Sequence, residues 1–476
     1  MLLKNQAFFL ATSALVAATA ARADVTISSD ATQGMSCSGG VCQPTASEAV
    51  LNAGDLETLL AAGNVTVTTT ASGVQADNID VTAKLGWSAK ALTLDAHRSI
   101  SVTELVTVRG RGGLSVLTKD GGSDGELAFS GNGHVTFRNL TDSLSINGVS
   151  YRLENSIASL AKAITKNPSG DYALAANYDA SKDWTYGNSP ITTDFTGSFE
   201  GLGNRISNLS LYVTTVARQR YLGLFTTVGG RISDLGVVGA SVSVGSVKRR
   251  RAQAYLGILA GTIRGTVSRC YSSGTVSGPK DTFAAGLVSV NTGTVTESHS
   301  SATVQAGIGA PAFTVAGGLV GTNAGQISLS YAIGSVASGG YSGGLAGDGD
   351  TGTIVNSYAT GAVSSGSSGG LVGLNTADVG TSYSTGGVSG NGDIGGLIGE
   401  DGSQTGSLND TYWDMDTSGI TNPDQGAGYP VNDPGITGLT TGQLQSGLPA
   451  GFDPSVWGEN ANINNGLPYL LSNPPE

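Results

Sequence analysis

The residues with the clearest potential for chemistry are acidic side chains that recur in glycine-rich turns. Asp348 and Asp350 stand two residues apart, as do Asp414 and Asp416 further along the chain. Because calcium prefers several oxygen ligands, these four aspartates are the candidate metal ligands. The segment from Asp414 begins like a calcium loop, but its twelfth position is Gln425 instead of Glu. Asp also bonds its own backbone in tight turns, so a structural role is the alternative.

Catalytic patterns are sparse in the sequence. His97, His134 and His299 are isolated, so there is no HExxH helix, and there is no GxSxG elbow. Glycine-rich runs such as GRGGLS lack the GK[ST] ending of a phosphate loop. A pair of carboxylates about 5 to 9 Å apart on adjacent coils could cleave a polysaccharide. No such pair recurs beside Lys or Arg on one strand face, so we expect no catalytic residue and no cofactor.

Tyrosines recur at one position of a repeated pattern, at 271, 331, 358, 383 and 412. Aligned rings suit the stacking of sugars, so a ligand-binding row is one interpretation. The other is a ladder of rings that stabilises a stack of coils. We favour the structural interpretation.

A repeat of 26 residues positions these side chains. Three units follow one another from Gly318, beginning GLVGTNAGQISLSYAIGSV, GLAGDGDTGTIVNSYATGAV and GLVGLNTADVGTSYSTGGV, and a fourth opens at Gly396. A fixed period of this size indicates stacked supersecondary units, because one unit alone cannot bury its apolar face. Short alternating segments between Val65 and Ile146 also fit strands. We expect an all-β fold, a β-solenoid of the right-handed parallel β-helix type, with short capping or inserted helices.

Coils of constant geometry predict ladders of identical residues about 4.8 Å apart. The predicted ladder residues are Leu319, Leu345, Leu371 and Leu397, with Tyr331, Tyr358 and Tyr383. Insertions at 246–254 and 306–314 lengthen the period. Recognition is therefore expected in these variable loops and in the acidic turns at 348–350 and 400–401.

The organisation of the chain follows from these patterns. Residues 1–23 have a positive start, an apolar stretch and an Ala-x-Ala site, so we expect a signal peptide. Residues 24–150 form a β-rich solenoid region with a capping helix over 47–62, for which Ser47 is the candidate cap. Residues 151–190 form a helical insertion, with a helix over 155–166. Residues 191–413 form the repeat solenoid, and 414–476 a cap or tail with a short helix over 441–444.

The cysteine content and the net charge of the chain bear on the compartment in which the protein works and on the partners that it can bind. Cys37 and Cys42, in CSGGVC, fit a small-loop disulfide in an oxidising compartment, since a metal pair would lack further ligands nearby. Cys270 takes the place of a repeated Ser and is predicted to be buried and inert. The net charge of −12 excludes a nucleic-acid partner. The basic run at 248–251 is interpreted as a solvated loop instead of a binding patch. No apolar stretch is long enough to span a bilayer.

The repeated G-G-L-[VIA]-G followed by S-Y-A-x-G-x-V resembles the GLUG motif of bacterial surface proteins. The matches are GGLVG at 317–321, then GGLAG, GGLVG and GGLIG. The preceding LSINGVSYRLENSIASLAKAITKNPSGDYALAANYDAS and FTGSFEGLGNRISNLSL look like the segment before such repeats in filamentous-haemagglutinin-like adhesins. The resemblance covers about 144–413 and implies a secreted or surface-attached β-helical protein with a role in adhesion.

The predicted function is that of an exported, non-enzymatic repeat protein, a secreted or cell-surface adhesin. Its partner would be a glycan or protein of a host or matrix surface. A structural spacer of the envelope or matrix is the first alternative, with the periplasm as the alternative location. A polysaccharide-active β-helix enzyme is the second alternative.

Overall fold

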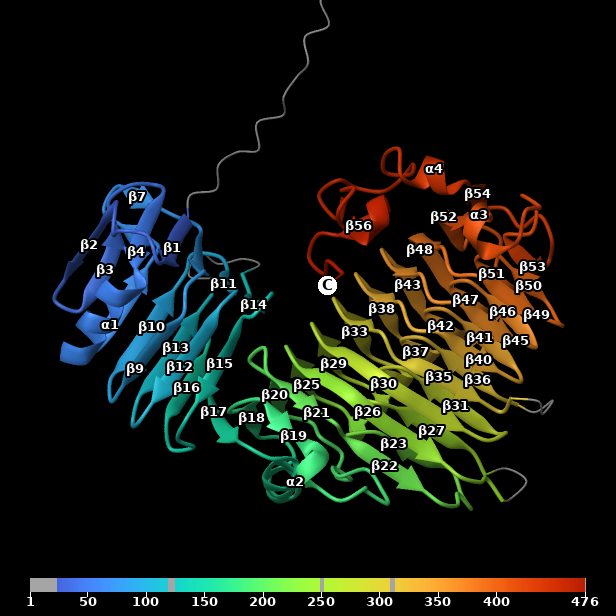
Figure 1. The fold of residues 1–476 in the computed structure, drawn as a ribbon, viewed down its shortest axis with the longest axis horizontal. Helices are drawn as coiled ribbons and strands as arrows, with labels where there is room; N and C mark the ends of the chain where they lie inside the picture. The colour runs from blue at the N-terminus through green and yellow to red at the C-terminus, as the bar shows by residue number, and fades with distance from the viewer. Residues whose placement is uncertain (1–23, 119–124, 249–251, 309–312, 476) are drawn as a thin grey trace, which may run out of the picture.

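The computed structural model describes residues 24–118, 125–248, 252–308 and 313–475. Their backbone winds into a β-solenoid of about 14 turns, which confirms the predicted fold class. Figure 1 shows the coils as an open arc, with the first half on the left and the second half rising on the right. The predicted signal peptide at 1–23, and residues 249–251 of the basic run, lie outside the described residues.

The first half is built from three columns of parallel strands. One column is, in spatial order, β14 (Leu127–Phe129), β11 (Ile100–Val102), β8 (Asn78–Val81), β1 (Asp24–Ser28) and β4 (Ala49–Asn52). The second is β5 (Val65–Thr68), β10 (Ala91–Asp95), β13 (Gly113–Leu117) and β16 (Ser143–Ile146). The third is β9 (Leu85–Ser88), β12 (Leu105–Arg109) and β15 (His134–Phe137). Every alternating segment predicted between Val65 and Ile146 lies in one of these strands, and their apolar residues fill one core.

Helix α1 (Ala53–Ala62) covers the open end of this core. Leu56 and Leu60 are fully buried against it. The helix begins six residues later than the pattern predicted, and Ser47 is not its cap. The amide oxygen of Asn52 accepts hydrogen bonds from Gly54 N and Asp55 N instead. The residues assigned to the first turns form strand β4, because pairing with β1 buries Ala49 and Leu51.

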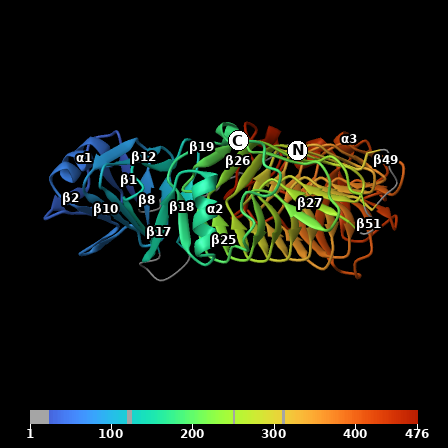
Figure 2. The ribbon, with the colours of Figure 1, turned by 90° about the horizontal axis from the view of Figure 1, so that it is seen from below.

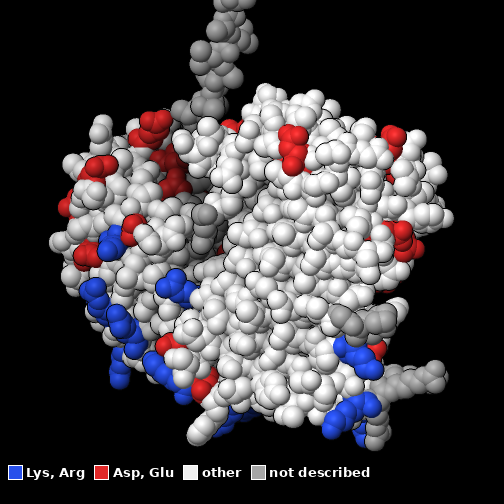
Figure 3. All heavy atoms as spheres, turned by 45° about the vertical axis from the view of Figure 1, so that its right-hand side comes forward, with Lys and Arg blue, Asp and Glu red and all other residues white. Residues whose placement is uncertain are grey.

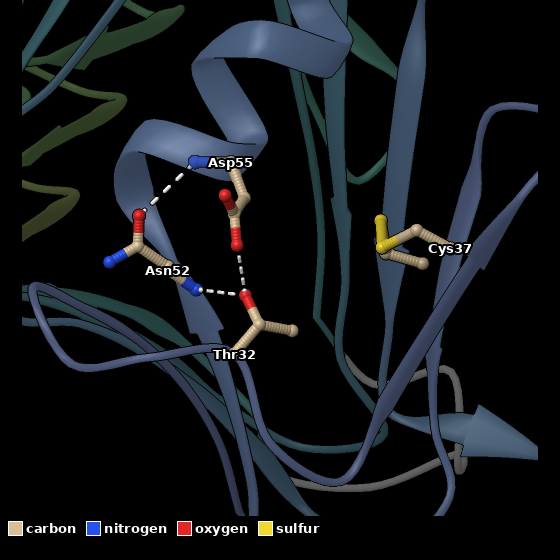
Figure 4. Close-up of a disulfide and its surroundings, with 5 residues drawn as sticks. Thr32, Cys37, Asn52 and Asp55 are labelled. Carbon is tan, nitrogen blue, oxygen red and sulfur yellow. Dashed lines mark hydrogen bonds between the residues drawn. A yellow bond between two sulfur atoms is a disulfide. The ribbon is translucent and has the colours of Figure 1, made fainter.

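A small hairpin lies beside α1. Strands β2 (Met35–Ser38) and β3 (Val41–Pro44) pair antiparallel and bring Cys37 opposite Cys42. The two sulfurs form a disulfide, as Figure 4 shows, next to the hydrogen bonds that hold Thr32, Asn52 and Asp55 together. A second small hairpin, β6 (Thr70–Ala71) and β7 (Val74–Gln75), projects from a turn.

Helix α2 (Ile157–Lys166) lies at the boundary between the halves (Figure 2). Ser156 caps its start, and its apolar face joins the core of the second half through residues such as Leu160 and Ile164. The connecting strands are β17 (Val149–Glu154), β18 (Asp171–Leu174) and β19 (Tyr178–Asp179), with a single 3-10 turn at Ala180–Lys182. Strand β17 pairs antiparallel with β16 and parallel with β18, so the stack passes through the boundary without a break.

Each full coil of the second half contributes up to five short strands. The first column is β20 (Ser198–Glu200), β25 (Arg231–Ser233), β29 (Thr266–Ser268), β33 (Thr294–Thr296), β38 (Gln326–Ser328), β43 (Thr353–Val355), β48 (Asp378–Ser384) and β52 (Leu408–Asp414). The next is β21 (Arg205–Ser207), β26 (Gly236–Val244), β30 (Tyr271–Gly278), β34 (His299–Ser300), β39 (Tyr331–Ala332) and β44 (Tyr358–Ala359). Strands β26 and β30 run on into a third column with β22 (Ser210–Val213), β35 (Thr303–Ala306), β40 (Val336–Ser338), β45 (Val363–Ser365) and β49 (Val388–Gly390).

Two further columns complete these coils. One is β23 (Arg220–Leu222), β27 (Ala254–Gly257), β31 (Thr282–Ala285), β36 (Val315–Gly317), β41 (Tyr341–Gly343), β46 (Ser367–Gly369) and β50 (Ile394–Gly395). The other is β24 (Phe225–Val228), β28 (Ala260–Ile263), β32 (Val288–Asn291), β37 (Val320–Asn323), β42 (Ala346–Gly349), β47 (Val372–Asn375), β51 (Ile398–Asp401) and β53 (Ala427–Tyr429).

Because the coil length is constant, equivalent residues of successive coils stack into ladders inside the second half. The four predicted leucines are fully buried, and the backbone N–H of each of Leu319, Leu345 and Leu371 donates to the carbonyl of the next leucine. A serine ladder runs beside them. Ser298, Ser330 and Ser357 each direct the backbone N–H to the serine hydroxyl of the following coil. Cys270 begins this row, buried, with its own N–H bonded to Ser298 Oγ.

An asparagine ladder satisfies the buried turn that follows strands β32, β37 and β47. The Asn291 side-chain amide donates to Asn323 Oδ1 over 2.7 Å, and that of Asn323 donates to Thr353 O. Both side chains are fully buried. Their amides therefore replace hydrogen bonds that water would otherwise supply.

Replacing Asn323 with Ala should destabilise the solenoid, because it leaves the Asn291 amide and the Thr353 carbonyl without this partner. We expect a loss of about 2 kcal/mol in the free energy of unfolding, measured by urea titration. Replacing the exposed Thr405 with Ala should change it by less than about 0.5 kcal/mol. Equal effects of the two substitutions would refute the ladder's role.

The stack continues one coil further than the repeat predicted. Strand β53 pairs with β51, and β54 (Ile436–Leu439) pairs with β52, with helix α3 (Met415–Ser418) between them. Helix α4 (Thr441–Leu444) matches the predicted short helix and has a capping box. Residues 440–475, here called the C-terminal segment, then fold back on the side of the second half that faces the first half (Figure 1). They include β55 (Trp457–Gly458), a 3-10 turn at Asn464–Gly466 and β56 (Tyr469–Leu470).

Candidate functional site

The recurring tyrosines form a continuous ladder of stacked rings. Ring centroids are 4.9 Å apart between Tyr331 and Tyr358 and 5.2 Å apart between Tyr358 and Tyr383. His299 takes the tyrosine position in its coil and stacks between Tyr271 and Tyr331, at 5.3 and 4.7 Å. The histidine that looked isolated in the sequence is therefore a rung of this ladder.

The C-terminal segment covers most of the ladder. Phe452 and Trp457 pack against the tyrosine rings, and Tyr331, Tyr358 and Tyr383 are at most 1% exposed. The Tyr383 hydroxyl donates to Pro468 O. Further along, Asn473 bonds to His299 Nδ1 and to Ser298 O. A ligand therefore has no access to these rings in this structure, and the ladder acts as a second core.

A column of left-handed residues runs beside the ladder. The residue two places before each tyrosine position has positive φ: Asp234, Arg269, Glu297, Leu329, Asn356, Thr381 and Asp410. None of them is glycine, although this region costs about 1 to 2 kcal/mol for other residues. These residues form the corner of each coil on the side of the second half that faces the first half.

Three of these corner residues, Asp234, Arg269 and Glu297, form a charged cluster with neighbouring side chains at the base of the arc. Arg269 forms a two-pronged pair with Asp234, with Nε to Oδ1 at 2.7 Å and Nη2 to Oδ2 at 3.0 Å. Its Nη1 contacts Glu126 Oε2 at 2.5 Å and Glu297 Oε2 at 3.3 Å. Glu126 precedes β14 in the first half, so Arg269 links the two halves.

Glu200 lies buried beside this cluster. Its carboxylate accepts hydrogen bonds from Ser233 Oγ and from Leu202 N. Burial, together with the charge of Asp234, raises the pKa of Glu200 to about 8. A neutral carboxylic acid and an arginine-paired carboxylate are thus adjacent, which is the arrangement that general acid–base chemistry uses.

The raised pKa of Glu200 predicts that stability falls as pH rises. In the unfolded chain the group ionises near its ordinary value of 4.5, whereas in the folded chain it keeps its proton until about pH 8. The folded state therefore holds the extra proton between these limits, so the contribution of Glu200 to stability is full below pH 4.5 and is lost as the pH rises towards 8. The decline should be on the order of a few kcal/mol.

Glu200→Gln tests this assignment, because the amide resembles the protonated acid and cannot ionise. We expect the variant to lose that part of the decline in unfolding free energy between pH 5 and 8. The exposed Glu48→Gln serves as the control and should keep the wild-type slope. Identical slopes for all three proteins would contradict a raised pKa.

The acidic candidates for calcium lie in turns and caps. Asp348 Oδ1 accepts a hydrogen bond from Asp350 N, and burial raises the pKa of Asp348 to about 6. Asp414 caps α3 and accepts from Thr441 Oγ1, and Asp416 accepts from Thr441 N. These carboxylates join α3 to α4. Within the described ranges, no group of three His, Cys, Asp or Glu side chains is placed to hold a metal ion.

The inserted loops lie together at one corner of the solenoid, here called the loop corner. It comprises the described residues of the connections that enter β23, β27, β31 and β36, which are 214–219, 245–248, 252–253, 279–281, 307–308 and 313–314. In later coils the same corner shrinks, to 339–340 before β41 and to 366 before β46. The first two connections stack on each other, since Val216 N donates to Ser246 O and Lys248 N to Val216 O.

A second row of stacked rings begins at the loop corner. Tyr221, Tyr255 and Phe283 occupy paired positions in β23, β27 and β31, with centroids 4.6 and 4.7 Å apart. Phe313 extends the row, 5.7 Å from Phe283, and is 66% exposed. Sequence analysis missed this row because the insertions make the spacing of its members irregular.

The polar groups around this ring row are hydrogen-bonded to one another. The Gln219 amide donates to the hydroxyls of Tyr221 and Tyr255, and the Tyr255 hydroxyl donates to Gln253 Oε1. At the far end of the same strand column, the Tyr341 hydroxyl donates to Glu400 Oε2 over 3.0 Å. The face is therefore polar and aromatic at the loop corner and acidic towards the C-terminal coils.

Comparisons with known proteins give a distant resemblance in structure. No family model matches the chain, and no curated protein matches it. A candidate immunoglobulin A1 protease from Bacteroides ovatus matches over 68% of this chain and 93% of its own, at 19% identity and a TM-score of 0.44. A structure described as IgA1 protease matches over 48% of this chain and 21% of its own, at 17% identity and a TM-score of 0.32. Similarity at this level assigns no activity.

Among the described helices, none combines the length and apolar character needed to cross a membrane.

Proposed function

We propose that this chain is an exported, non-enzymatic adhesin whose β-solenoid presents a recognition surface to a host or matrix partner. Export rests on the signal-peptide pattern at 1–23 and on the disulfide of Cys37 and Cys42, which suits an oxidising compartment. The resemblance of the repeats to the GLUG motif of bacterial surface proteins supports the same function.

The observation that carries the proposal is the clustering of insertions at the loop corner. In repeat proteins the scaffold stays constant, and insertions gathered on one face often form the binding face. Here the insertions also bring out Ile308 and Phe313, which are 64% and 66% exposed. Both belong to the connection that enters β36, and exposed apolar side chains are a feature of interaction sites.

Attachment to a surface tests the proposal. Deleting the gene should reduce cell attachment without altering envelope integrity, and restoring the wild-type gene should recover attachment. Restoring the double variant Ile308→Ser and Phe313→Ser should recover less, because both side chains are exposed and their loss leaves the core intact. A structural spacer predicts no attachment defect in any of these strains.

A polysaccharide-active enzyme is the second candidate, and the adjacency of Glu200, Asp234 and Arg269 favours it. Burial raises the pKa of Glu200, and Asp234 is paired with Arg269, whereas a glycan-cleaving site needs one acid and one base or nucleophile. Both side chains are at most 7% exposed, so a substrate would need the arc to open. Release of reducing ends from acidic and neutral glycans would establish this activity, and its loss in Glu200→Gln would assign it to this pair.

A further inference from the structure

We propose that the chain cuts itself at the peptide bond between Asp433 and Pro434, with the Asp433 carboxyl as the nucleophile and Asp401 as the group that moves the proton. This inference goes beyond the proposed adhesin function and does not depend on it, because the reaction needs no partner. It is carried by two carboxyl groups that the last coils bring into contact beside a bond to proline.

The asparagine ladder ends in a carboxylate. Asp401 of β51 takes the position that Asn375 holds in β47. The Asn375 amide donates to Asp401 Oδ1 over 2.7 Å, and the Ser403 hydroxyl donates to Asp401 Oδ2 over 2.8 Å. A carboxylate only accepts hydrogen bonds, so the ladder continues past Asp401 only if the next group donates one.

The next group is the carboxyl of Asp433. It is hydrogen-bonded to Asp401, and its Oδ2 is buried and receives no hydrogen bond from a described residue. Two carboxyl groups in contact do not both ionise, so they share one proton. Burial and the contact with Asp401 raise the pKa of Asp433 to about 7. At neutral pH and below, the pair therefore holds a proton that it can transfer.

This pair has no cation beside it. The sequence contains no Lys or Arg after Lys280. Within the described ranges, no salt bridge involves Asp401 or Asp433. In Figure 3 the upper right of the molecule, where the last coils lie, shows acidic side chains and no basic one. Sharing a proton is therefore how the two carboxyl groups avoid repelling each other.

The bond that follows Asp433 suits cleavage by this pair. A carboxyl oxygen of an aspartate can close a cyclic anhydride with the carbonyl carbon of the same residue. Proline supplies a tertiary amide nitrogen, which takes up a proton more readily than a secondary amide and so leaves more easily. Asn432 and Gly435 flank the bond with φ of 63° and 94°, a region that strains a non-glycine residue such as Asn432. Pro434 is exposed, so water reaches the bond.

The reaction balances in two steps. Asp401 takes the proton from the Asp433 carboxyl, whose oxygen attacks the carbonyl carbon of Asp433. The new C–O bond forms, the C–N bond to Pro434 breaks, and Asp401 passes the proton to the proline nitrogen. Water then opens the cyclic anhydride, which leaves Asp433 with two carboxyl groups and Pro434 with a free amino terminus.

Cleavage leaves residues 434–475 attached by noncovalent contacts alone. Strand β54 still pairs with β52, and Phe452 and Trp457 still pack on the tyrosine ladder. The two pieces therefore stay together in the folded protein and separate on denaturation. The cover of the ladder becomes a separate chain.

Incubation of the purified mature protein with protease inhibitors tests the proposal. Denaturing gels and intact mass spectrometry should show a fragment that begins at Pro434, formed at a rate independent of protein concentration. The rate should fall as the pH rises through about 7, because the pair then has no proton to give to the proline nitrogen.

The second Asp–Pro bond of the chain is the internal control. Asp453 is exposed, and its Oδ1 accepts a hydrogen bond from Ser455 N over 2.8 Å. No second carboxyl is hydrogen-bonded to it among the described residues. The bond between Asp453 and Pro454 should therefore stay intact under conditions that cut the bond after Asp433.

Variants separate the roles of the two carboxyl groups. Asp401→Asn restores the amide of the ladder but removes the proton carrier, so it should slow cleavage about 100-fold. Asp433→Ala should abolish cleavage, and Pro434→Ala should slow it while leaving both carboxyl groups in place. Asp378→Asn, at an exposed aspartate of a neighbouring coil, should be cut at the wild-type rate.

Three results would overturn the inference. The first is an intact chain after prolonged incubation at pH 6. The second is equal cutting at both Asp–Pro bonds, or at equal rates in urea and in the folded state, since either would show ordinary acid lability without a role for the fold. The third is an unchanged rate in Asp401→Asn, which would remove the proton carrier from the mechanism.

Discussion

Replacing Arg269 with Met should lower the free energy of unfolding by about 3 to 5 kcal/mol at pH 7.5. The side chain is only 15% exposed and faces Asp234, whose side chain is 2% exposed. Removing one partner of a buried ion pair leaves the other charge without compensation, and the cost of that is in this range. Glu297 also contacts Arg269 directly, so the variant leaves both Asp234 and Glu297 without this cation.

The effect of this substitution should depend on pH and on the partner that is removed. Below about pH 5 the abandoned carboxylates can take up protons, so the loss should shrink. Glu126→Gln should cost less than about 1 kcal/mol, because the Glu126 side chain is 44% exposed and water screens its pair with Arg269. Urea unfolding of both variants, with the exposed Arg205→Met as control, measures these differences. A loss below 1 kcal/mol for Arg269→Met at pH 7.5 would refute the buried-pair interpretation.

The parts of the fold that follow from periodicity could be predicted from the sequence. The leucine ladder at 319, 345, 371 and 397 needs only a constant coil length, because a buried position must recur in every coil. The alternating segments of the first half were likewise readable, since one face of each strand is buried. The start of α1 was not, because the helical pattern over 47–52 competes with pairing of β4 to β1, and the pairing prevails.

The charged cluster could not be predicted, because the arc of the solenoid brings Glu126 of the first half to Arg269 of the second half. Glu126 and Arg269 are far apart in the sequence, and no local pattern marks them as neighbours. The left-handed corner had only a weak signal, because both x positions of the [IV]-x-x-[SC]-[YH] pattern vary and only the second of them is left-handed. The cover of the tyrosine ladder had none, because Phe452 and Trp457 lie in a segment without repeat or periodicity.

Replacing Trp457 with Ala should release the C-terminal segment from the tyrosine ladder. The indole is 1% exposed, packs on Phe452, Tyr358 and Tyr383, and donates a hydrogen bond to Asn356 Oδ1 over 3.2 Å. Truncating a buried Trp to Ala costs about 3 to 5 kcal/mol. Because the ladder is a core separate from that of the coils, we expect the segment to open locally while the solenoid stays folded.

Limited proteolysis and hydrogen exchange measure that opening. Trp457→Ala should be cut within 440–475 and should lose exchange protection there, with little change in the coils. Trp184→Ala, at an exposed indole, should leave both unchanged. If Trp457→Ala instead unfolds the whole chain in one transition, the C-terminal segment and the solenoid form a single cooperative unit.

Two tyrosines of the ladder separate the contribution of ring packing from that of hydrogen bonding. The Tyr383 hydroxyl donates to Pro468 O at 2.5 Å and accepts from Asn464 Nδ2 at 2.9 Å, so Tyr383→Phe should cost about 1 to 3 kcal/mol. The Tyr358 hydroxyl is buried with no hydrogen-bond partner among the described residues, so Tyr358→Phe should be neutral or stabilising by up to about 1 kcal/mol. Both variants keep the ring, so both should keep the C-terminal segment in place. Urea unfolding that gives the two variants the same stability would show that the hydroxyl contacts contribute nothing, and that ring stacking alone holds the segment on the ladder.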